Sequence, residues 1–143
     1  MKLADEAETR ALGAKVARLL QPGDVITLQG PLGAGKTSFA RGLIEALGHE
    51  GEVPSPSFAI VQPYDHLDLP VWHVDLYRLE DPSELEELGL DATEDSVLLV
   101  EWPEMAGRWD HALQLEIAID EALGARRLTA HVPPGWKTRW PPR

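Results

Sequence analysis

The sequence contains no cysteine and no asparagine. Without cysteine the chain can form neither disulfide bonds nor a thiolate metal site, which excludes a disulfide-stabilised secreted domain. No apolar run approaches the roughly 18 residues that a membrane-spanning helix needs. The N-terminal stretch MKLADEAETRALG also lacks the apolar core of a secretory signal. We therefore expect a cytoplasmic protein.

Basic residues are scarce, because 13 Lys and Arg stand against 24 Asp and Glu and give a net charge of −11. Residues 79–104 hold ten acidic residues and no Lys or Arg. Such a chain repels a phosphate backbone, so we expect no strong autonomous binding to nucleic acid. Segment 133–143, PPGWKTRWPPR, is the exception, with three bases and two tryptophans that could stack on a base or a partner. Because chain ends usually fray, we expect a loosely ordered tail there rather than an RNA contact.

The 143 residues, of which 43% are hydrophobic, fit one globular domain over residues 1–143. Apolar residues recur at helical spacing before Pro22, alternate with polar ones from Ala112 onward, and form a continuous run at 97–100. These patterns predict helices at about 4–20, at 36–48 and between Asp81 and Gly89, strands at 24–29, 58–64, 71–77 and 96–102, and a hairpin over about 112–132. This order predicts an α/β fold with a central parallel sheet and an antiparallel C-terminal edge hairpin.

The stretch GPLGAGKTSF, residues 30–39, follows a predicted strand and opens a predicted helix. Its Gly-x-x-x-x-Gly-Lys-Thr spacing is typical of a loop whose backbone N–H groups surround phosphate oxygens, which predicts a P-loop nucleotide-binding fold. Lys36 can reach the β- and γ-phosphates, and the Thr37 hydroxyl can bind a magnesium ion that bridges them. The predicted nucleotide-binding residues of this loop are Gly30, Leu32, Gly33, Ala34, Gly35, Lys36, Thr37 and Ser38.

Two acidic residues follow apolar strands and can complete a magnesium site. Glu101 ends the run Val97–Val100, where the acidic residue of a Walker B strand holds magnesium or its water. Asp75 lies in or at the end of VWHVDLY, where a carboxylate can orient attacking water or bind magnesium through water. Ligands of open α/β sheets bind beyond the carboxyl ends of the strands, which is where both acids lie. Trp102 either stacks on the nucleobase or belongs to the core, and His73 is assigned no role.

Four sequence blocks together resemble the TsaE family, small P-loop ATPases that are accessory proteins of bacterial tRNA threonylcarbamoyladenosine synthesis. The blocks are ETRALGAKVARLLQPGDVITLQGPLGAGKTSFARGLIEALG, VPSPSF, HVDLYRLEDPSELEELGL and LVEWPE. The glycine loop occurs in many families, whereas the four blocks in this order and at this spacing are specific. Ser57 departs from the family pattern, which usually has Thr at that position.

The resemblance implies ATP as the nucleotide, Mg²⁺ as the metal, and slow hydrolysis that supports a complex of TsaB and TsaD. These partners would transfer the threonylcarbamoyl group to tRNA. The resemblance also implies residue roles. Thr37 and Glu101 would hold magnesium, Lys36, Asp75 and Glu101 would be catalytic, Trp102 would lie near the nucleotide, and Ser55 and Ser57 would belong to a switch-like loop that senses it.

Two other function classes remain open on the residues alone. A P-loop small-molecule kinase uses the same loop, but it predicts an arginine-bearing lid, and the bases after the loop are scattered here. A non-hydrolysing nucleotide-binding interaction module would keep Lys36 and Thr37 and could dispense with Asp75 and Glu101. A GTPase is less favoured, because its Asn-Lys-x-Asp signature cannot occur in a chain without Asn.

Overall fold

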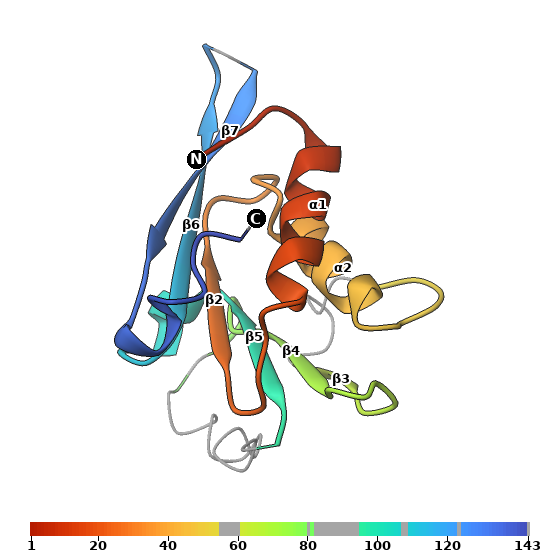
Figure 1. Cartoon of the computed structure of the whole chain (residues 1–143). Helices are drawn as coiled ribbons and strands as arrows, with labels where there is room; N and C mark the ends of the chain where they lie inside the picture. Colours follow the sequence, from red (N-terminus) through yellow and green to blue (C-terminus); the bar gives the residue numbers. More distant parts are fainter. Residues whose placement is uncertain (55–60, 80, 82–94, 107–108, 123, 143) are drawn as a thin grey trace.

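The structure is a computed structural model that describes residues 1–143 except 55–60, 80, 82–94, 107, 108, 123 and 143. The described residues form a mixed seven-stranded sheet in the order β1-β7-β6-β2-β5-β4-β3, with two α-helices side by side on one of its faces (Figure 1). The strands are β1 (Lys2–Leu3), β2 (Val25–Gln29), β3 (Val61–Tyr64), β4 (Val71–Asp75), β5 (Val97–Glu101), β6 (Leu113–Asp120) and β7 (Ala125–His131), and the helices are α1 (Glu6–Ala17) and α2 (Lys36–Ala46).

The centre of the sheet is parallel and its edges are antiparallel. Strand β2 pairs in parallel with β5 and with β6, and β5 pairs in parallel with β4. The hairpin of β6 and β7 and the pair of β3 and β4 are antiparallel. The predicted fold class is confirmed. One detail differs from the prediction. Strand β1 pairs with β7, so β1 and not the C-terminal hairpin forms this edge of the sheet.

Helix α1 is shorter than the predicted range of about 4–20 because its caps lie inside that range. Asp5 has an extended backbone, and its side chain accepts a hydrogen bond of 2.9 Å from the Glu8 N–H, which marks the start of the helix. At the other end, the Leu19 N–H bonds to the carbonyl of Val16 in a tighter turn. The helix predicted between Asp81 and Gly89 lies outside the described residues, as do residues 58–60 of a predicted strand.

Two glycines let α1 and α2 pack backbone against backbone. A Cβ atom on Gly13 would lie 2.2 Å from the Phe39 carbonyl oxygen, and one on Gly42 would lie 1.9 Å from the Arg10 carbonyl oxygen. Real Cβ atoms do not approach backbone this closely, so the two helices hold this spacing only with glycine at both positions. The contact fixes the direction in which the N-terminus of α2 points.

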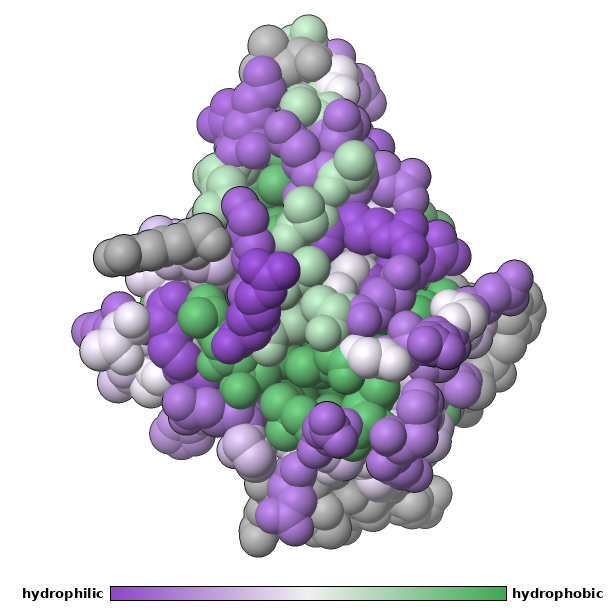
Figure 2. Space-filling model, turned by 45° about the vertical axis from the view of Figure 1, so that its right-hand side comes forward, coloured by the Kyte–Doolittle hydropathy of each residue, from purple (hydrophilic) through white to green (hydrophobic). Residues whose placement is uncertain are grey.

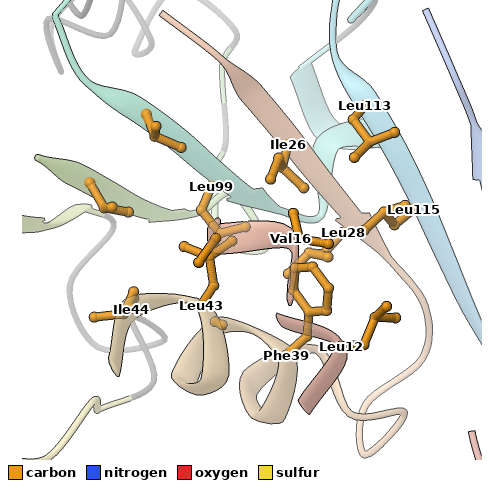
Figure 3. Packing of buried hydrophobic residues seen from close by; sticks show 14 of the residues in the cluster. Leu12, Val16, Ile26, Leu28, Phe39, Leu43, Ile44, Leu99, Leu113 and Leu115 are labelled. Atoms are coloured by element: carbon orange, nitrogen blue, oxygen red, sulfur yellow. The ribbon is translucent and has the colours of Figure 1, made fainter. Parts of the chain in front are cut away.

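The main core lies between these helices and one face of the sheet. Figure 3 shows side chains of α1 and α2 meeting those of the central strands, with Leu12, Val16, Phe39, Leu43 and Ile44 on the helix side and Ile26, Leu28, Leu99, Leu113 and Leu115 on the sheet side. Alternate residues of β4 and β5 point to the opposite face, where Val74, Leu98 and Val100 form a second cluster with Leu76 and Leu79. Both faces of the central strands are therefore buried, as expected of a parallel sheet.

The C-terminal segment is ordered where it is described, so the prediction of a loosely ordered tail at 133–143 is wrong. Trp136 is 2% exposed within the 3₁₀ turn Pro134–Trp136. The Arg139 guanidinium lies 3.8 Å from the centre of that ring and bonds to both carboxylate oxygens of Asp24 at 2.7 and 3.1 Å. It also bonds to the Leu19 carbonyl at 2.9 Å. Burying an aromatic side chain stabilises the folded state by about 1.5–3 kcal/mol, which offsets the conformational entropy lost when a short chain end becomes ordered. Trp136 is thus not free to stack on a nucleic-acid base.

The surface is largely polar, in keeping with the acidic composition. On the face shown in Figure 2, hydrophilic residues cover most of the view and hydrophobic ones gather in its lower middle part. Among the described residues, no helix combines the length and the hydropathy of a membrane span.

Replacing Gly42 with Ala should destabilise the protein. In an ordinary helix interior this change is favourable by about 1 kcal/mol, but here the added methyl group must push α1 away from α2. We expect Gly42→Ala to lower the free energy of unfolding by about 1–3 kcal/mol, as overpacking does. Gly135→Ala is the matched control, because no described atom lies within 4 Å of its added Cβ. Chemical denaturation measures both, and equal stability of the two variants would contradict the close contact.

Candidate functional site

The site lies at the edge of the sheet where β2, β5 and β4 end. Parallel pairing aligns the ends of these strands, since Leu28 is in register with Glu101 and Glu101 is in register with Asp75. The Trp102 N–H then donates to the Leu28 carbonyl at 3.3 Å. The two acids predicted from separate sequence segments thus occupy neighbouring strands, at the same level as the start of the glycine loop.

The glycine loop joins β2 to α2 and presents the N-terminus of this helix to the site. Gly35 is the N-cap residue, with φ of 109°, and no side chain among the described residues caps this helix. The first backbone N–H groups of α2 therefore have no capping acceptor, and its first turn carries no acidic residue. Partial positive charge and free donors at a helix start favour an anion such as phosphate.

Lys36, the first residue of α2, turns its side chain back into the site. Its Nζ donates to the Gly30 carbonyl and lies 3.8 Å from the centre of the Trp102 ring. Burial lowers the pKa of the Lys36 ammonium, while the nearby carboxylates of Glu101, Asp75 and Glu104 act in the opposite direction. A buried ammonium held by one carbonyl and a ring face has spare donors for an anionic ligand.

Asp75 ends β4 and is buried. Burial raises the pKa of its carboxyl above the ordinary value for Asp, and the charge of Glu101 adds to this shift. The Tyr77 N–H, which donates to Oδ1 at 2.8 Å, opposes the shift, as do His73 and Lys36. Asp75 is therefore a stronger base than an exposed carboxylate, and its backbone contact fixes one of its oxygens.

Glu101 ends β5, and its carboxylate contacts a histidine. The His73 Nε2 and the Glu101 Oε2 are 2.7 Å apart, and the two side chains are 0% and 5% exposed. A carboxylate only accepts, so the histidine donates through Nε2–H. His73 and Asp75 alternate with Val74 along β4 and thus face the same side of the sheet.

Trp102 follows Glu101 with a φ of 59°, which is uncommon for a large side chain. This backbone turn places its ring over the Lys36 Nζ and 4.9 Å from the ring of Tyr77. Trp102 is partly buried, packs against the second hydrophobic cluster and also lines the site, so it has a core contact as well as a place in the cleft. Its contact with Lys36 places the ring beside the first residue of α2.

These side chains line one cleft of about 440 Å³. The structure brings together in it most of the residues predicted from the sequence: Leu32, Gly33, Gly35, Lys36, Thr37, Ser38, Asp75, Glu101 and Trp102. Gly30 and Ala34 do not line it, because Gly30 lies against β6 and Ala34 is fully buried. Ser55 and Ser57 lie outside the described residues.

Magnesium fits the donors that line this cleft. Thr37 offers a hydroxyl oxygen, and Glu101 and Asp75 offer carboxylate oxygens, which are the hard ligands that Mg²⁺ prefers. Within the described part of the chain, no group of three or more His, Cys, Asp or Glu side chains could hold a metal ion. In a Mg²⁺–phosphate site, one or two protein ligands are usually completed by water and phosphate.

Arg126, from β7, contacts the glycine loop from outside the cleft. Its Nη2 donates to the Gly33 carbonyl at 3.1 Å, and both residues line a second cavity of about 300 Å³ that adjoins the loop. A loop that turns its N–H groups toward phosphate must turn carbonyls elsewhere, and the Arg126 guanidinium donates to one of these carbonyls. The C-terminal hairpin thereby supports the loop.

Sequence reasoning missed His73, Arg126 and Tyr77 as parts of the site. His73 is two residues before Asp75, a spacing that puts both side chains on one face of a strand, and this signal was present in the sequence. Tyr77 lines the cleft beside Trp102. Arg126 is 93 residues from Gly33 in the chain, and no local pattern could have paired them.

A glycine loop between a central parallel strand and a helix, faced by carboxylates from the next strands, is the arrangement of the P-loop nucleotide-binding fold. The comparisons with known proteins identify the family. A family model described as threonylcarbamoyl adenosine biosynthesis protein TsaE matches residues 3–128. The chain belongs to the TsaE family.

Relatives and a solved structure agree with this assignment. The tRNA threonylcarbamoyladenosine biosynthesis protein TsaE of Bacillus subtilis is 44% identical over 117 residues, covering 80% of this chain and 73% of that protein. The protein of the same name from Streptomyces coelicolor is 45% identical over 121 residues, covering 80% of each. A crystal structure of Bacillus subtilis YdiB superposes with a TM-score of 0.79 at 32% identity, covering 96% of this chain and 88% of that one.

Removing the Arg126 side chain should weaken binding of a phosphate-bearing probe such as ATP. Without its contact to Gly33 the loop is less ordered before binding, and a net hydrogen-bond contribution of about 0.5–1.5 kcal/mol corresponds to a loss of roughly two- to twelvefold in affinity. Arg127→Ala is the matched control, since Arg127 is exposed and lies 3.6 Å from Asp120 instead. Isothermal titration calorimetry measures both variants. Equal affinities for Arg126→Ala and Arg127→Ala would show that the loop does not depend on this contact.

Proposed function

We propose that this member of the TsaE family binds ATP with Mg²⁺ and hydrolyses it slowly, in support of a complex of TsaB and TsaD homologues. Family membership places the chain in threonylcarbamoyl adenosine biosynthesis. The observation that carries the ATPase proposal is the cleft in which Lys36, Thr37, Asp75 and Glu101 converge on the N-terminus of α2. We also propose the cytoplasm as its location, because its relatives act in a tRNA modification.

In this proposal the loop and α2 bind the phosphates. The first N–H groups of the helix and the Lys36 ammonium meet the phosphate oxygens, and Lys36 exchanges the Gly30 carbonyl for one of them. Thr37 and Glu101 would hold Mg²⁺, which would supply positive charge to the phosphate oxygens. The Trp102 ring covers Lys36 and restricts water at this end of the cleft.

Asp75 is the residue proposed to act on the attacking water. Its raised pKa makes it a better proton acceptor than an exposed carboxylate, and the Tyr77 N–H holds it in place. The Asp75 carboxylate accepts a hydrogen bond from water and orients the water's oxygen toward the terminal phosphate. Transfer of the threonylcarbamoyl group itself is assigned to the partners.

The proposal predicts Mg²⁺-dependent ATP hydrolysis that TsaB and TsaD homologues accelerate and that Lys36→Ala abolishes. Removing the ammonium takes away the side chain that reaches the β- and γ-phosphates. Phosphate release is measured with the chain alone and then with both partners. Lys15→Ala, on the exposed side of α1, is the matched control.

Other outcomes of this assay would replace the proposal. If a small metabolite becomes phosphorylated while the partners change nothing, the protein is a P-loop kinase. Binding of ATP without turnover under any of these conditions would identify a nucleotide-binding interaction module.

Replacing Asp75 with Asn should lower turnover by about 10²-fold, the typical contribution of a positioned general base, with little change in ATP affinity. Stability should not fall. Because the folded-state pKa of Asp75 is raised, its ionisation costs stability as pH rises through that pKa, and Asn removes this cost. We therefore expect Asp75→Asn to unfold at the same temperature as the unchanged protein or higher near pH 8.

Asp68→Asn serves as the control for Asp75→Asn, since Asp68 is an exposed residue outside the cleft. Single-turnover kinetics, calorimetry and thermal unfolding are compared for the two variants. Equal losses of affinity and of turnover in Asp75→Asn would point to a metal-binding or structural role instead.

A further inference from the structure

The buried contact between His73 and Glu101 has no part in the function proposed so far. Its 2.7 Å bond joins two side chains that are 0% and 5% exposed, on the adjacent strands β4 and β5. The residues next to them on the same face of these strands, Val71 and Leu99, are apolar and belong to the main core. A polar histidine therefore stands between the core and the cleft.

This pair is costly as a purely structural feature. Burying polar groups is unfavourable unless they are hydrogen-bonded, and an apolar residue at position 73 would fill the space without that cost. Moreover, the His73 Nδ1 is buried with no hydrogen-bond partner among the described residues. Within the described part of the chain, the imidazole thus makes one hydrogen bond, which is the bond to Glu101.

The partner of Nε2 fixes the direction of this hydrogen bond. A carboxylate only accepts, so Nε2 carries a proton and His73 is the donor. The imidazole therefore aims one N–H group at one carboxylate oxygen of Glu101.

We propose that His73 is a positioning residue that fixes the carboxylate of Glu101 for Mg²⁺. A glutamate side chain has several rotatable bonds, and restraining one oxygen through His73 reduces the rotamers open to it before the metal binds. The other oxygen remains outside this bond, in a side chain that lines the cleft. Residues that orient metal ligands in this way typically contribute 10- to 100-fold to metal affinity. This inference rests on the proposed function, since it requires Mg²⁺ at Glu101.

Two substitutions test the N–H donor of His73 and the volume of its ring separately. His73→Gln keeps an N–H donor near the position of Nε2, and His73→Leu fills similar space without one. For His73→Leu, we expect the Mg²⁺ concentration needed for half-maximal ATP binding, measured by calorimetry, to rise about tenfold, as for other residues that orient metal ligands. ATP binding in excess EDTA should not change. His73→Gln should restore Mg²⁺ dependence to within about threefold of the unchanged protein. His111→Leu, at an exposed histidine, is the matched control.

The action through Glu101 has its own test. In a Glu101→Gln background, His73→Leu should cause no further change in Mg²⁺ dependence, because residues that act as one unit are not additive. Nitrogen-15 NMR of the imidazole should show the proton on Nε2 in the unchanged protein without any ligand. An Nε2 without a proton, or additive effects of the two substitutions, would overturn the inference.

The failure of this inference is distinguishable from failure of the proposed function. If the unchanged protein binds ATP equally with Mg²⁺ and with EDTA, the metal site and the positioning role are both wrong. If it requires Mg²⁺ and His73→Leu has the same requirement, only the positioning role is wrong. If His73→Leu does not fold, His73→Gln and the NMR measurement test the positioning role instead. A tenfold loss of Mg²⁺ affinity in a folded His73→Gln variant, which keeps the donor, would also contradict the inference.

Discussion

The parallel pairing of β2, β5 and β4 is the constraint on which the site depends. It brings three strand ends to one edge of the sheet, and the glycine loop, Glu101 and Asp75 each follow directly from one of these ends. Helix α2 must then start at the same edge, and its close backbone contact with α1 through Gly42 sets its direction. A shift of one residue in the register of β4 against β5 would turn Asp75 and His73 to the opposite face.

Elements remote from the cleft hold this arrangement in place. Arg126 of the C-terminal hairpin bonds to the Gly33 carbonyl, and Arg139 of the last segment bonds to Asp24 at the start of β2. Both arginines act on the chain that enters or leaves the central strand β2. The segment from β6 to the C-terminus therefore supports the strand and loop that carry the site, although none of its described residues lines the main cleft.

The elements and the motif could be predicted from the sequence, whereas contacts between distant segments could not. The period-two pattern after Ala112 predicted the hairpin, and the apolar run before Glu101 predicted a buried parallel strand. Composition misled at the C-terminus, because a segment rich in Pro, Arg and Trp resembles a loose tail until the ring of Trp136 finds a place in the core. The pairing of His73 with Glu101 depends on strand order and pleat, which no local pattern specifies.

The site keeps polar groups where the rest of the same sheet face is apolar. Lys36, His73, Asp75 and Glu101 are all buried, and burial alone shifts the pKa values of Lys36 and Asp75 in the directions that disfavour their charges. The charges of Asp75 and Glu101 are offset only in part by the single ammonium of Lys36. A cation bound near Glu101 would supply the missing positive charge, and phosphate at α2 would supply the missing acceptors for its N–H groups. The cation and the phosphate would thus supply different groups that the same cleft lacks, and we therefore expect them to bind together.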